Sequence, residues 1–398
     1  MTTLYGTKET LANLNIKQMK NTNIGICFGG YCPLHQGHMD VIMRAKKEND
    51  VCYVIVCGYN GEPRGWEINL NLDQRFEIIK EFFKGDEQIR VKKINDTELG
   101  IDESMSDHNW TVWQNKVKEY IDEDFPWQKK YSAISNDGTL KQYYTDTPIT
   151  WYVAEPFYKQ AIERNNVLNA TVMLVEKTNQ VSGTAIRKNP IKYWNKITKP
   201  FKKYLTKNIL IVGTASEGKS TLTRDISRYF DIPYAEEWAR TYMAKHNLTD
   251  VNLTVGDFKA FIEGQTKLCL KKIEESHNGL FISDTDFCVT LMYALAYAND
   301  DNINISAKEV TDLLYPIAEK VMDKIKWDKI FVFPPNKDFV DDGCRYMKQS
   351  TMDEREKNFI KLQKFLNTFY PEVTKEYLVG SYLENFNVVK DYINSISE

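Results

Sequence analysis

The second half of the chain contains the stretch that decides its fold, Gly213-Thr214-Ala215-Ser216-Glu217-Gly218-Lys219-Ser220. It fills every fixed position of the phosphate-loop pattern G-x-x-x-x-G-K-[ST]. An apolar, β-branched run at 208–212 precedes it and a helical pattern at 220–229 follows it, as this loop requires. Backbone N–H groups of such a loop surround phosphates, and its lysine and hydroxyl face the β/γ oxygens and Mg²⁺. We therefore expect ATP to be bound by Gly213, Gly218, Lys219, Ser220 and Thr221, with Lys219 also catalytic and Ser220 a Mg²⁺ ligand.

Two aspartates follow the next buried strand pattern of this half, at 279–283. Asp284 and Asp286 stand at the carboxyl end of a parallel strand near the phosphate loop, where a metal or a general base is needed. We expect both to be catalytic, Asp284 to bind Mg²⁺ and Asp286 to contact the substrate. Aspartates at strand ends are also common turn and cap residues, and the pattern does not identify the base.

Charged segments on either side of these aspartates add candidates. Glu237 and Arg240 belong to the sequence EEWAR and can bind a sugar hydroxyl or a second phosphate. Arg345 and Arg355 lie in a polar segment that reads as mobile and as preceding a helix. We expect these two arginines to bind phosphate from a lid, although such charge runs are more often solvated surface.

The first half carries a second glycine-framed motif, Gly29-Gly30-Tyr31-Cys32-Pro33-Leu34-His35-Gln36-Gly37-His38, after an apolar run at 23–28. The glycines permit close approach of a ligand, and a helix that starts near Gly37 favours a phosphate at its N-terminus. His35 and His38 then share one helical face and can donate to phosphate oxygens in a transition state. A zinc site is less suitable, because HxxH supplies only two ligands and no third accompanies it. We expect catalysis by His35 and His38, and phosphate binding by Gly29, Gly30 and Tyr31.

Two other segments of the first half complete this candidate site. Ser182 caps a short helical pattern that carries Thr184 and Arg187, and together they form a second phosphate clamp, with Arg187 catalytic. Trp110 and Trp113 lie on one apolar helical stripe. For Trp113 this favours the core, whereas Trp110 fits the core and the stacking of a heteroaromatic base equally well.

Strand patterns alternate with helical patterns along both halves, which predicts an α/β protein with doubly wound parallel sheets. The chain has 398 residues and a net charge of −3, with 42% hydrophobic residues, and neither a membrane span nor a secretory leader is visible. We expect a polar lead at 1–22 and two domains, at 23–198 and 199–398. The seven cysteines lack CxxC spacing and read as reduced, buried thiols of a cytoplasmic protein, with only Cys32 expected to be exposed.

The combination of motifs resembles a known family. The HxGH sequence, together with a distant helix that carries Ser/Thr and Arg, resembles the signature of the nucleotidyltransferases that transfer AMP to a phosphate-bearing acceptor. Residues 22 to about 395 resemble the bifunctional nicotinamide-nucleotide adenylyltransferase/ribosylnicotinamide kinases of bacterial NAD salvage. The matching pieces are GGYCPLHQGH, DHNWTVW, VSGTAIRKNPIKYW, GTASEGKST, EEWAR, FISDTDF and DDGCR.

The resemblance implies a Rossmann-like nucleotidyltransferase domain followed by a P-loop kinase domain. The kinase would phosphorylate nicotinamide riboside with ATP and Mg²⁺, and the first domain would adenylate the mononucleotide to NAD. Glu237, Arg240 and the aspartates would surround the riboside, and Trp110 would face nicotinamide. Enzymes of coenzyme A or flavin synthesis, and a sensor of NAD or ATP with one inactive domain, are the alternatives.

Partners other than small molecules receive little support. Some members of the family carry an N-terminal helix-turn-helix domain, and about twenty residues before the first strand are too few for it. The slightly acidic net charge also argues against DNA as a partner. A homo-oligomer is compatible with the sequence.

Overall fold

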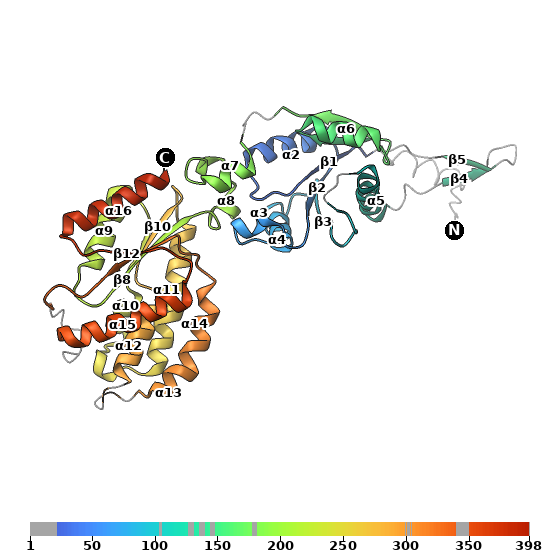
Figure 1. Cartoon of the computed structure of the whole chain (residues 1–398). Helices are drawn as coiled ribbons and strands as arrows, with labels where there is room; N and C mark the ends of the chain where they lie inside the picture. Colours follow the sequence, from blue (N-terminus) through green and yellow to red (C-terminus); the bar gives the residue numbers. More distant parts are fainter. Residues whose placement is uncertain are drawn as a thin grey trace, which may run out of the picture. The chain divides into compact units, whose positions relative to one another are not determined.

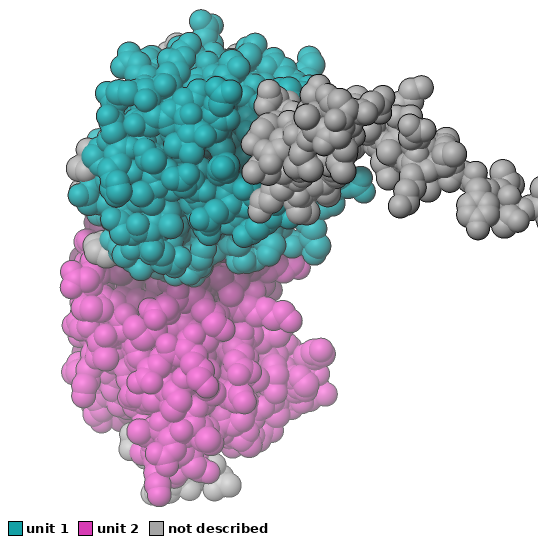
Figure 2. All heavy atoms as spheres, turned by 90° about the vertical axis from the view of Figure 1, so that its right-hand side faces the viewer, with its two compact units in different colours: residues 1–188, 195–201 teal, residues 189–194, 202–398 magenta. Residues whose placement is uncertain are grey.

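The computed structural model describes residues 22–102, 106–125, 131–134, 140–143, 148–176, 181–298, 300, 303, 305–339 and 350–397. Contacts divide the chain into two compact units, shown in teal and magenta in Figure 2. The first comprises residues 1–188 and 195–201, and the second 189–194 and 202–398. The sequence predicts a single boundary at 198/199. The contacts instead assign residues 189–194 to the second unit and residues 195–201 to the first. Ile197 pairs with His35 of the first unit, and Trp194 lies beside Gly279 of the second.

The first unit is built on a parallel five-stranded sheet of order β3-β2-β1-β6-β7. Its strands are β1 (Ile24–Gly29), β2 (Val51–Gly58), β3 (Ile89–Asn95), β6 (Ile149–Val153) and β7 (Thr171–Leu174). Its helices are α2 (Gln36–Glu48), α3 (Pro63–Glu67), α4 (Leu72–Phe82), α5 (Asp107–Asp124), α6 (Pro156–Arg164), α7 (Gly183–Lys188) and α8 (Lys199–Lys202) (Figure 1). The strand β4 (Tyr131–Ile134) pairs with β5 (Leu140–Tyr143) in antiparallel fashion, and the 3₁₀ turn η2 covers Trp194–Lys196.

The two faces of this sheet follow from the alternation of its side chains. Ile24 and Ile26 of β1 share a core with α5 and α6. Cys27, the residue after Ile26, points to the other face of the sheet, where its thiol donates to the Val41 carbonyl of α2. The chain order reverses between β1 and β6, and ligands of such sheets bind at the carboxyl ends of the strands at that point.

The second unit repeats the plan with a parallel sheet of order β12-β11-β8-β10-β9 (Figure 1). Its strands are β8 (Lys207–Gly213), β9 (Tyr234–Ala235), β10 (Leu280–Asp284), β11 (Lys329–Phe333) and β12 (Lys375–Tyr377). Its helices are α9 (Lys219–Phe230), α10 (Trp238–His246), η3 (Asp250–Asn252), α11 (Val255–Glu274), α12 (Phe287–Tyr297), α13 (Ala307–Glu309), η4 (Val310–Leu314), α14 (Tyr315–Met322), α15 (Met352–Phe369) and α16 (Tyr382–Ser397).

Alternate residues of β8 again separate the two faces of the sheet. Ile209 and Ile211 pack with α9 and α16, whereas Leu210 and Val212 pack with α11, α12, α14 and α15. The α/β prediction with parallel sheets in both halves is therefore confirmed. Between α13 and α14 the helical run passes through the π-helical turn η4 just before Pro316, whose ring nitrogen cannot donate a helical hydrogen bond.

Candidate active sites

The phosphate loop joins β8 to α9 as the sequence predicts. Gly213 has φ +151°, and a Cβ there would lie 2.4 Å from the Phe333 carbonyl oxygen, so a side chain does not fit. Ser216 and Gly218 also have positive φ, at 64° and 89°, and this curls the backbone toward the start of α9. Lys219 donates from Nζ to the Thr214 carbonyl at 2.7 Å, while Ser220 is half-buried and Thr221 is exposed in the first turn.

Asp284, at the end of β10, lies next to this loop. Its carboxyl group is 3% exposed, and burial raises its pKa, while the Lys219 charge and a hydrogen bond with the Ser220 hydroxyl oppose that rise. The charges of Glu237 and Arg240 also act on it. A carboxylate and a hydroxyl side by side are the hard oxygen donors that Mg²⁺ prefers, so Ser220 and Asp284 fit this ion.

Asp286 does not face the same site, so the prediction that it contacts substrate is wrong. Its Oδ1 accepts from the Cys288 N–H at 2.9 Å as the N-cap of α12, and its Oδ2 accepts from the Tyr370 hydroxyl at 2.7 Å. Thr285 between the two aspartates has φ +105°, which interrupts the strand alternation. The turn therefore sends Asp284 toward the loop and Asp286, 4% exposed, into the core.

Burial of Asp286 predicts a pH-dependent stability. Burial raises its pKa to about 6 from 3.8, so the folded protein holds this proton more tightly than the unfolded chain does. Its contribution to the free energy of unfolding therefore falls as pH rises from about 4 to about 6, by about 3 kcal/mol. We expect Asp286→Asn, measured by denaturant unfolding, to gain stability relative to wild type between pH 4 and pH 7. If the difference in the free energy of unfolding between the variant and wild type were the same at pH 4 and at pH 7, this prediction would be contradicted.

Arg355 stabilises the phosphate loop through contacts with the Ala215 carbonyl and the Glu217 carboxylate. It lies in the first turn of α15, not before a helix, and its guanidinium is 2% exposed. It forms an ion pair with Glu217 of the loop and donates to the carbonyls of Ala215 at 2.9 Å and Lys337 at 2.6 Å. The prediction that Arg355 belongs to a mobile lid is therefore wrong, because its donors are turned to protein carbonyls and Glu217. Arg345 lies outside the described residues.

Removal of this arginine should destabilise the second unit. Glu217 is 0% exposed, and burial raises the pKa of its carboxyl against the opposing Arg355 charge. Arg355→Ala leaves that carboxylate buried without the cation, which costs about 3–5 kcal/mol. We expect calorimetry to show a lowered unfolding temperature of the unit. The double variant Glu217→Gln/Arg355→Met, which leaves no buried charge, should recover most of the loss; if it recovers none, the charge pair is not the cause.

A cavity of about 120 Å³ opens among α10, α11 and α12. Glu237 and Arg240 line it, as the sequence predicts for substrate contacts, and pair through Nε and Oε2 at 2.8 Å. Thr285 also lines it, which connects the cavity to the end of β10. Sequence patterns missed the remaining polar lining, Asp250, Gln265, Thr290, Tyr293 and Tyr297, because these residues meet only through helix packing.

The HxGH motif forms the first unit's site at the carboxyl end of β1. His35 is the N-cap residue of α2, and its ring stacks on that of His38 with centroids 3.8 Å apart. Tyr31 contacts the His38 ring edge-on at 4.9 Å. The two imidazoles thus lie together as their spacing predicts. No group of three His, Cys, Asp or Glu side chains suited to a metal occurs among the described residues, which gives the zinc alternative no support.

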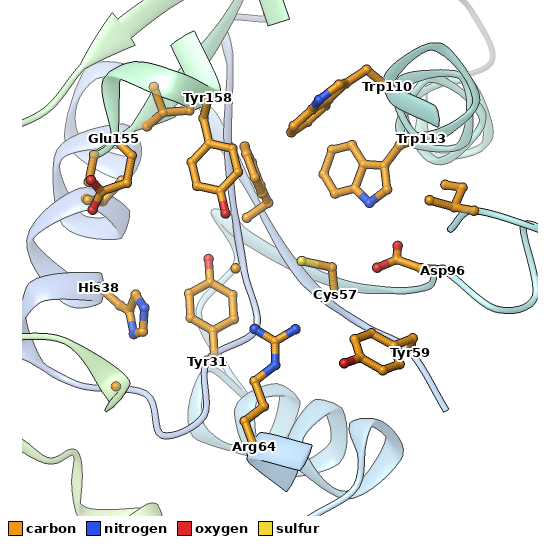
Figure 3. A pocket seen from close by; sticks show the side chains of 18 of the residues that line it. Tyr31, His38, Cys57, Tyr59, Arg64, Asp96, Trp110, Trp113, Glu155 and Tyr158 are labelled. Atoms are coloured by element: carbon orange, nitrogen blue, oxygen red, sulfur yellow. The ribbon is translucent and has the colours of Figure 1, made fainter. Parts of the chain in front are cut away.

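A cavity of about 590 Å³ extends from these histidines (Figure 3). Gly29, Gly30 and Tyr31 line one part of it, and Trp110 and Trp113 of α5 another. This volume is in the range of small-molecule and cofactor sites. Cys32, expected to be exposed, is 4% exposed because its thiol turns inward and donates to the Arg64 carbonyl at 3.1 Å.

The two tryptophans belong to the core and to the cavity at once. Trp110 is 6% and Trp113 is 7% exposed, and both pack around Phe28. Trp110 Nε1 is buried with no hydrogen-bond partner among the described residues, although its ring lines the cavity. Trp110 therefore belongs to the core and also lines the cavity, where its stacking on a heteroaromatic base stays a prediction. Trp113 belongs to the core as predicted, and its ring also lines the cavity.

Ser182 and Arg187 lie where the sequence predicts, at the ends of a short helix. The exposed Ser182 hydroxyl accepts from the Ala185 N–H at 3.1 Å and lines the cavity. Arg187 donates to the Cys32 carbonyl at 2.7 Å, pairs with Glu67 and donates to the Thr184 hydroxyl at 3.3 Å. The helix is thereby fastened to the loop that carries the HxGH motif.

Arg64 and Asp96 are cavity residues that sequence patterns missed. Arg64, from α3, pairs with the buried Glu62 and points its guanidinium into the cavity (Figure 3). A Cβ at Gly30 would lie 2.5 Å from Arg64 Nη1, so this glycine admits the arginine. Burial raises the pKa of Asp96 to about 6, and Arg64 opposes the rise. Asp96 directly follows β3, and this place at the carboxyl end of a strand is a signal that could have found it, whereas Arg64 lies in α3, six residues after the end of β2.

Comparisons with known proteins agree with this two-site organisation. A cytidylyltransferase-like family model matches residues 26–189, and an AAA domain model matches residues 208–377. The trifunctional NAD biosynthesis/regulator protein NadR of Salmonella typhimurium is 25% identical over 381 residues, 94% of this chain and 84% of that protein. NadR of Escherichia coli is 25% identical over 351 residues, 86% of this chain and 76% of that protein.

Solved structures give the same result. A crystal structure of NadR in complex with NAD and AMP-PNP has a TM-score of 0.74 and 26% identity, and covers 94% of this chain and 96% of that one. A crystal structure of NadR in complex with NR has a TM-score of 0.76 and 27% identity, and covers 95% of this chain and 96% of that one. None of the helices in the described residues has the length and apolar character needed to cross a membrane. The chain is similar to the NadR proteins over both of its units.

Proposed function

We propose that the chain is a bifunctional enzyme of NAD salvage. The second unit transfers the γ-phosphoryl group of ATP to the 5′-hydroxyl of nicotinamide riboside, and ADP leaves. The first unit joins the phosphate of the resulting mononucleotide to the α-phosphorus of a second ATP, and pyrophosphate leaves. The observation that carries this is the presence of both a P-loop with an adjoining cavity and an HxGH cavity in a chain similar to NadR along nearly its whole length.

Roles in the kinase unit follow from position. The loop amides and Lys219 hold the ATP phosphates, and Ser220 and Asp284 would hold Mg²⁺, which neutralises phosphate charge when bound. Asp284 lies beside Lys219 and within the charge field of Glu237 and Arg240, so it is the aspartate we assign as base for the riboside hydroxyl. Glu237 and Arg240 hold the ribose in the adjoining cavity.

Roles in the first unit follow in the same way. His35, His38 and Arg187 stabilise charge on the ATP phosphates, with Gly29, Gly30, Tyr31, Ser182 and Thr184 around them. Trp110 stacks on the nicotinamide ring, and Arg64 is placed for the acceptor phosphate. Because the acceptor phosphate is itself the nucleophile, no covalent enzyme intermediate is needed and positioning supplies the catalysis.

A second acceptor is suggested by one relative. The phosphopantetheine adenylyltransferase of Fusobacterium nucleatum is 37% identical over 68 residues, 17% of this chain and 39% of that protein. Incubation of the protein with ATP and Mg²⁺ and either nicotinamide riboside or phosphopantetheine, with products separated by chromatography, tests both. We expect mononucleotide and then NAD from the riboside. Adenylation of phosphopantetheine with no product from the riboside or the mononucleotide would overturn the proposal.

A further inference from the structure

The cavity of the second unit combines aromatic rings with an excess of negative charge. Its aromatic lining comes from α11 and α12 and consists of Phe258, Phe261, Tyr293 and Tyr297. Its ionisable lining, tyrosines aside, consists of Glu237, Arg240 and Asp250. Arg240 is paired with Glu237 at 2.8 Å, and the lining holds one more carboxylate than guanidinium. At about 120 Å³ the cavity is small, which suits part of a nucleoside better than a whole dinucleotide.

Asp250 is held firmly in this lining. It begins the short 3₁₀ turn η3, whose capping box between Thr249 and Asn252 fixes the backbone. Its side chain is 7% exposed, and its Oδ2 accepts from the Tyr297 hydroxyl at 2.6 Å. Tyr297 is 4% exposed in the last turn of α12. The carboxylate is therefore set against the cavity by groups from two separate elements.

A buried carboxylate beside aromatic faces favours a cationic ligand. Aromatic rings attract a cation over their faces, and they do so more strongly where water is excluded. A carboxylate in the same desolvated wall adds charge attraction that is weakened less than it would be in water. A neutral ring of the same shape fills the cavity equally well but gains neither interaction. The cavity therefore has the means to distinguish two ligands by charge alone.

We propose that Asp250 is a specificity-determining residue that selects a nucleoside with a positively charged ring. This rests on the proposed function, in which the phosphoryl acceptor is nicotinamide riboside, whose ring is a pyridinium cation. The neutral counterpart is the reduced riboside, in which the ring is a 1,4-dihydropyridine with the same carboxamide and ribose. Asp250 raises the efficiency of phosphorylation for the oxidised riboside and has little effect on that for the reduced one.

The test compares kcat/KM for phosphorylation of the two ribosides by the full chain. We expect wild type to prefer the oxidised riboside at least about tenfold, which is about 1.4 kcal/mol. Asp250→Asn retains an oxygen that can accept from Tyr297, and should lose about tenfold on the oxidised riboside with less than about twofold change on the reduced one. Asp250→Glu should keep the preference. Asp231→Asn removes the same charge from a side chain that is 95% exposed and should change neither value.

The unfolding temperature of the second unit, measured by calorimetry on the same samples, reports whether each variant is folded. The proposal is overturned if wild type phosphorylates both ribosides equally well, a result that needs no variant. It is also overturned if Asp250→Asn lowers both efficiencies by the same factor, since Asp250 would then have only a structural role. If wild type phosphorylates neither riboside, the proposed kinase function itself is wrong and this inference falls with it.

Discussion

Lys219→Ala should abolish phosphorylation of nicotinamide riboside and leave adenylation of the mononucleotide unchanged. The ammonium group of Lys219 lies at the phosphate loop and donates to the Thr214 carbonyl. Its positive charge also acts to lower the pKa of Asp284. Loss of such a preorganised charge from a phosphoryl-transfer site costs about 100- to 1,000-fold or more in kcat. The measurement is a pair of assays on one protein sample, riboside to mononucleotide and mononucleotide to NAD, each followed by chromatography.

A lysine on the surface of the same unit provides the control. Lys271→Ala removes a side chain that is 71% exposed and whose Nζ lies 3.8 Å from Glu275, so both activities should stay at the wild-type level. The assignment of the two reactions to two sites would be wrong if Lys219→Ala lost both activities while its unfolding temperature was unchanged.

His38→Ala should give the reciprocal result. His38 stacks on His35 and contacts the Tyr31 ring in the cavity of the first unit. We expect NAD formation from the mononucleotide to fall about 100- to 1,000-fold, because the imidazole is positioned to donate to phosphate oxygens that gain charge in the transition state. Phosphorylation of the riboside should continue, so the mononucleotide should accumulate when the riboside and ATP are supplied together.

His277 offers a matched control for this histidine. Its side chain is 55% exposed and lies 3.2 Å from Asp231, remote in sequence from either motif. His277→Ala should leave both reactions at the wild-type rate. Unchanged NAD formation by His38→Ala would remove the HxGH motif from the proposed catalytic machinery.

The two motifs and their strands were predictable because each is a local pattern. The phosphate loop and the HxGH loop each combine fixed glycines with a strand before and a helix after, so short-range sequence is enough to locate them. Arg64 and Asp96 carry no such pattern. They reach the first cavity only because β2 lies beside β1 and β3 lies beside β2, and the order of strands is a tertiary property.

The direction of a side chain was harder to predict than its position. In an extended strand residues two apart share a face, so Asp284 and Asp286 read as a pair. The positive φ of Thr285 reverses that expectation, and a β-branched residue in this conformation is not foreseen from sequence. Arg355 was misplaced for a related reason, since its partner Glu217 is far away in the chain.

The ion pair between Arg355 and Glu217 also has a consequence for the order in which the protein is made. These two residues are separated by 138 positions, and Arg355 donates to Ala215 across 140. A nascent chain that ends at Met322 contains the whole phosphate loop but not the arginine that neutralises its buried glutamate. Long-range contacts of this kind form late in folding. The loop therefore acquires its final support only after α15 has left the ribosome.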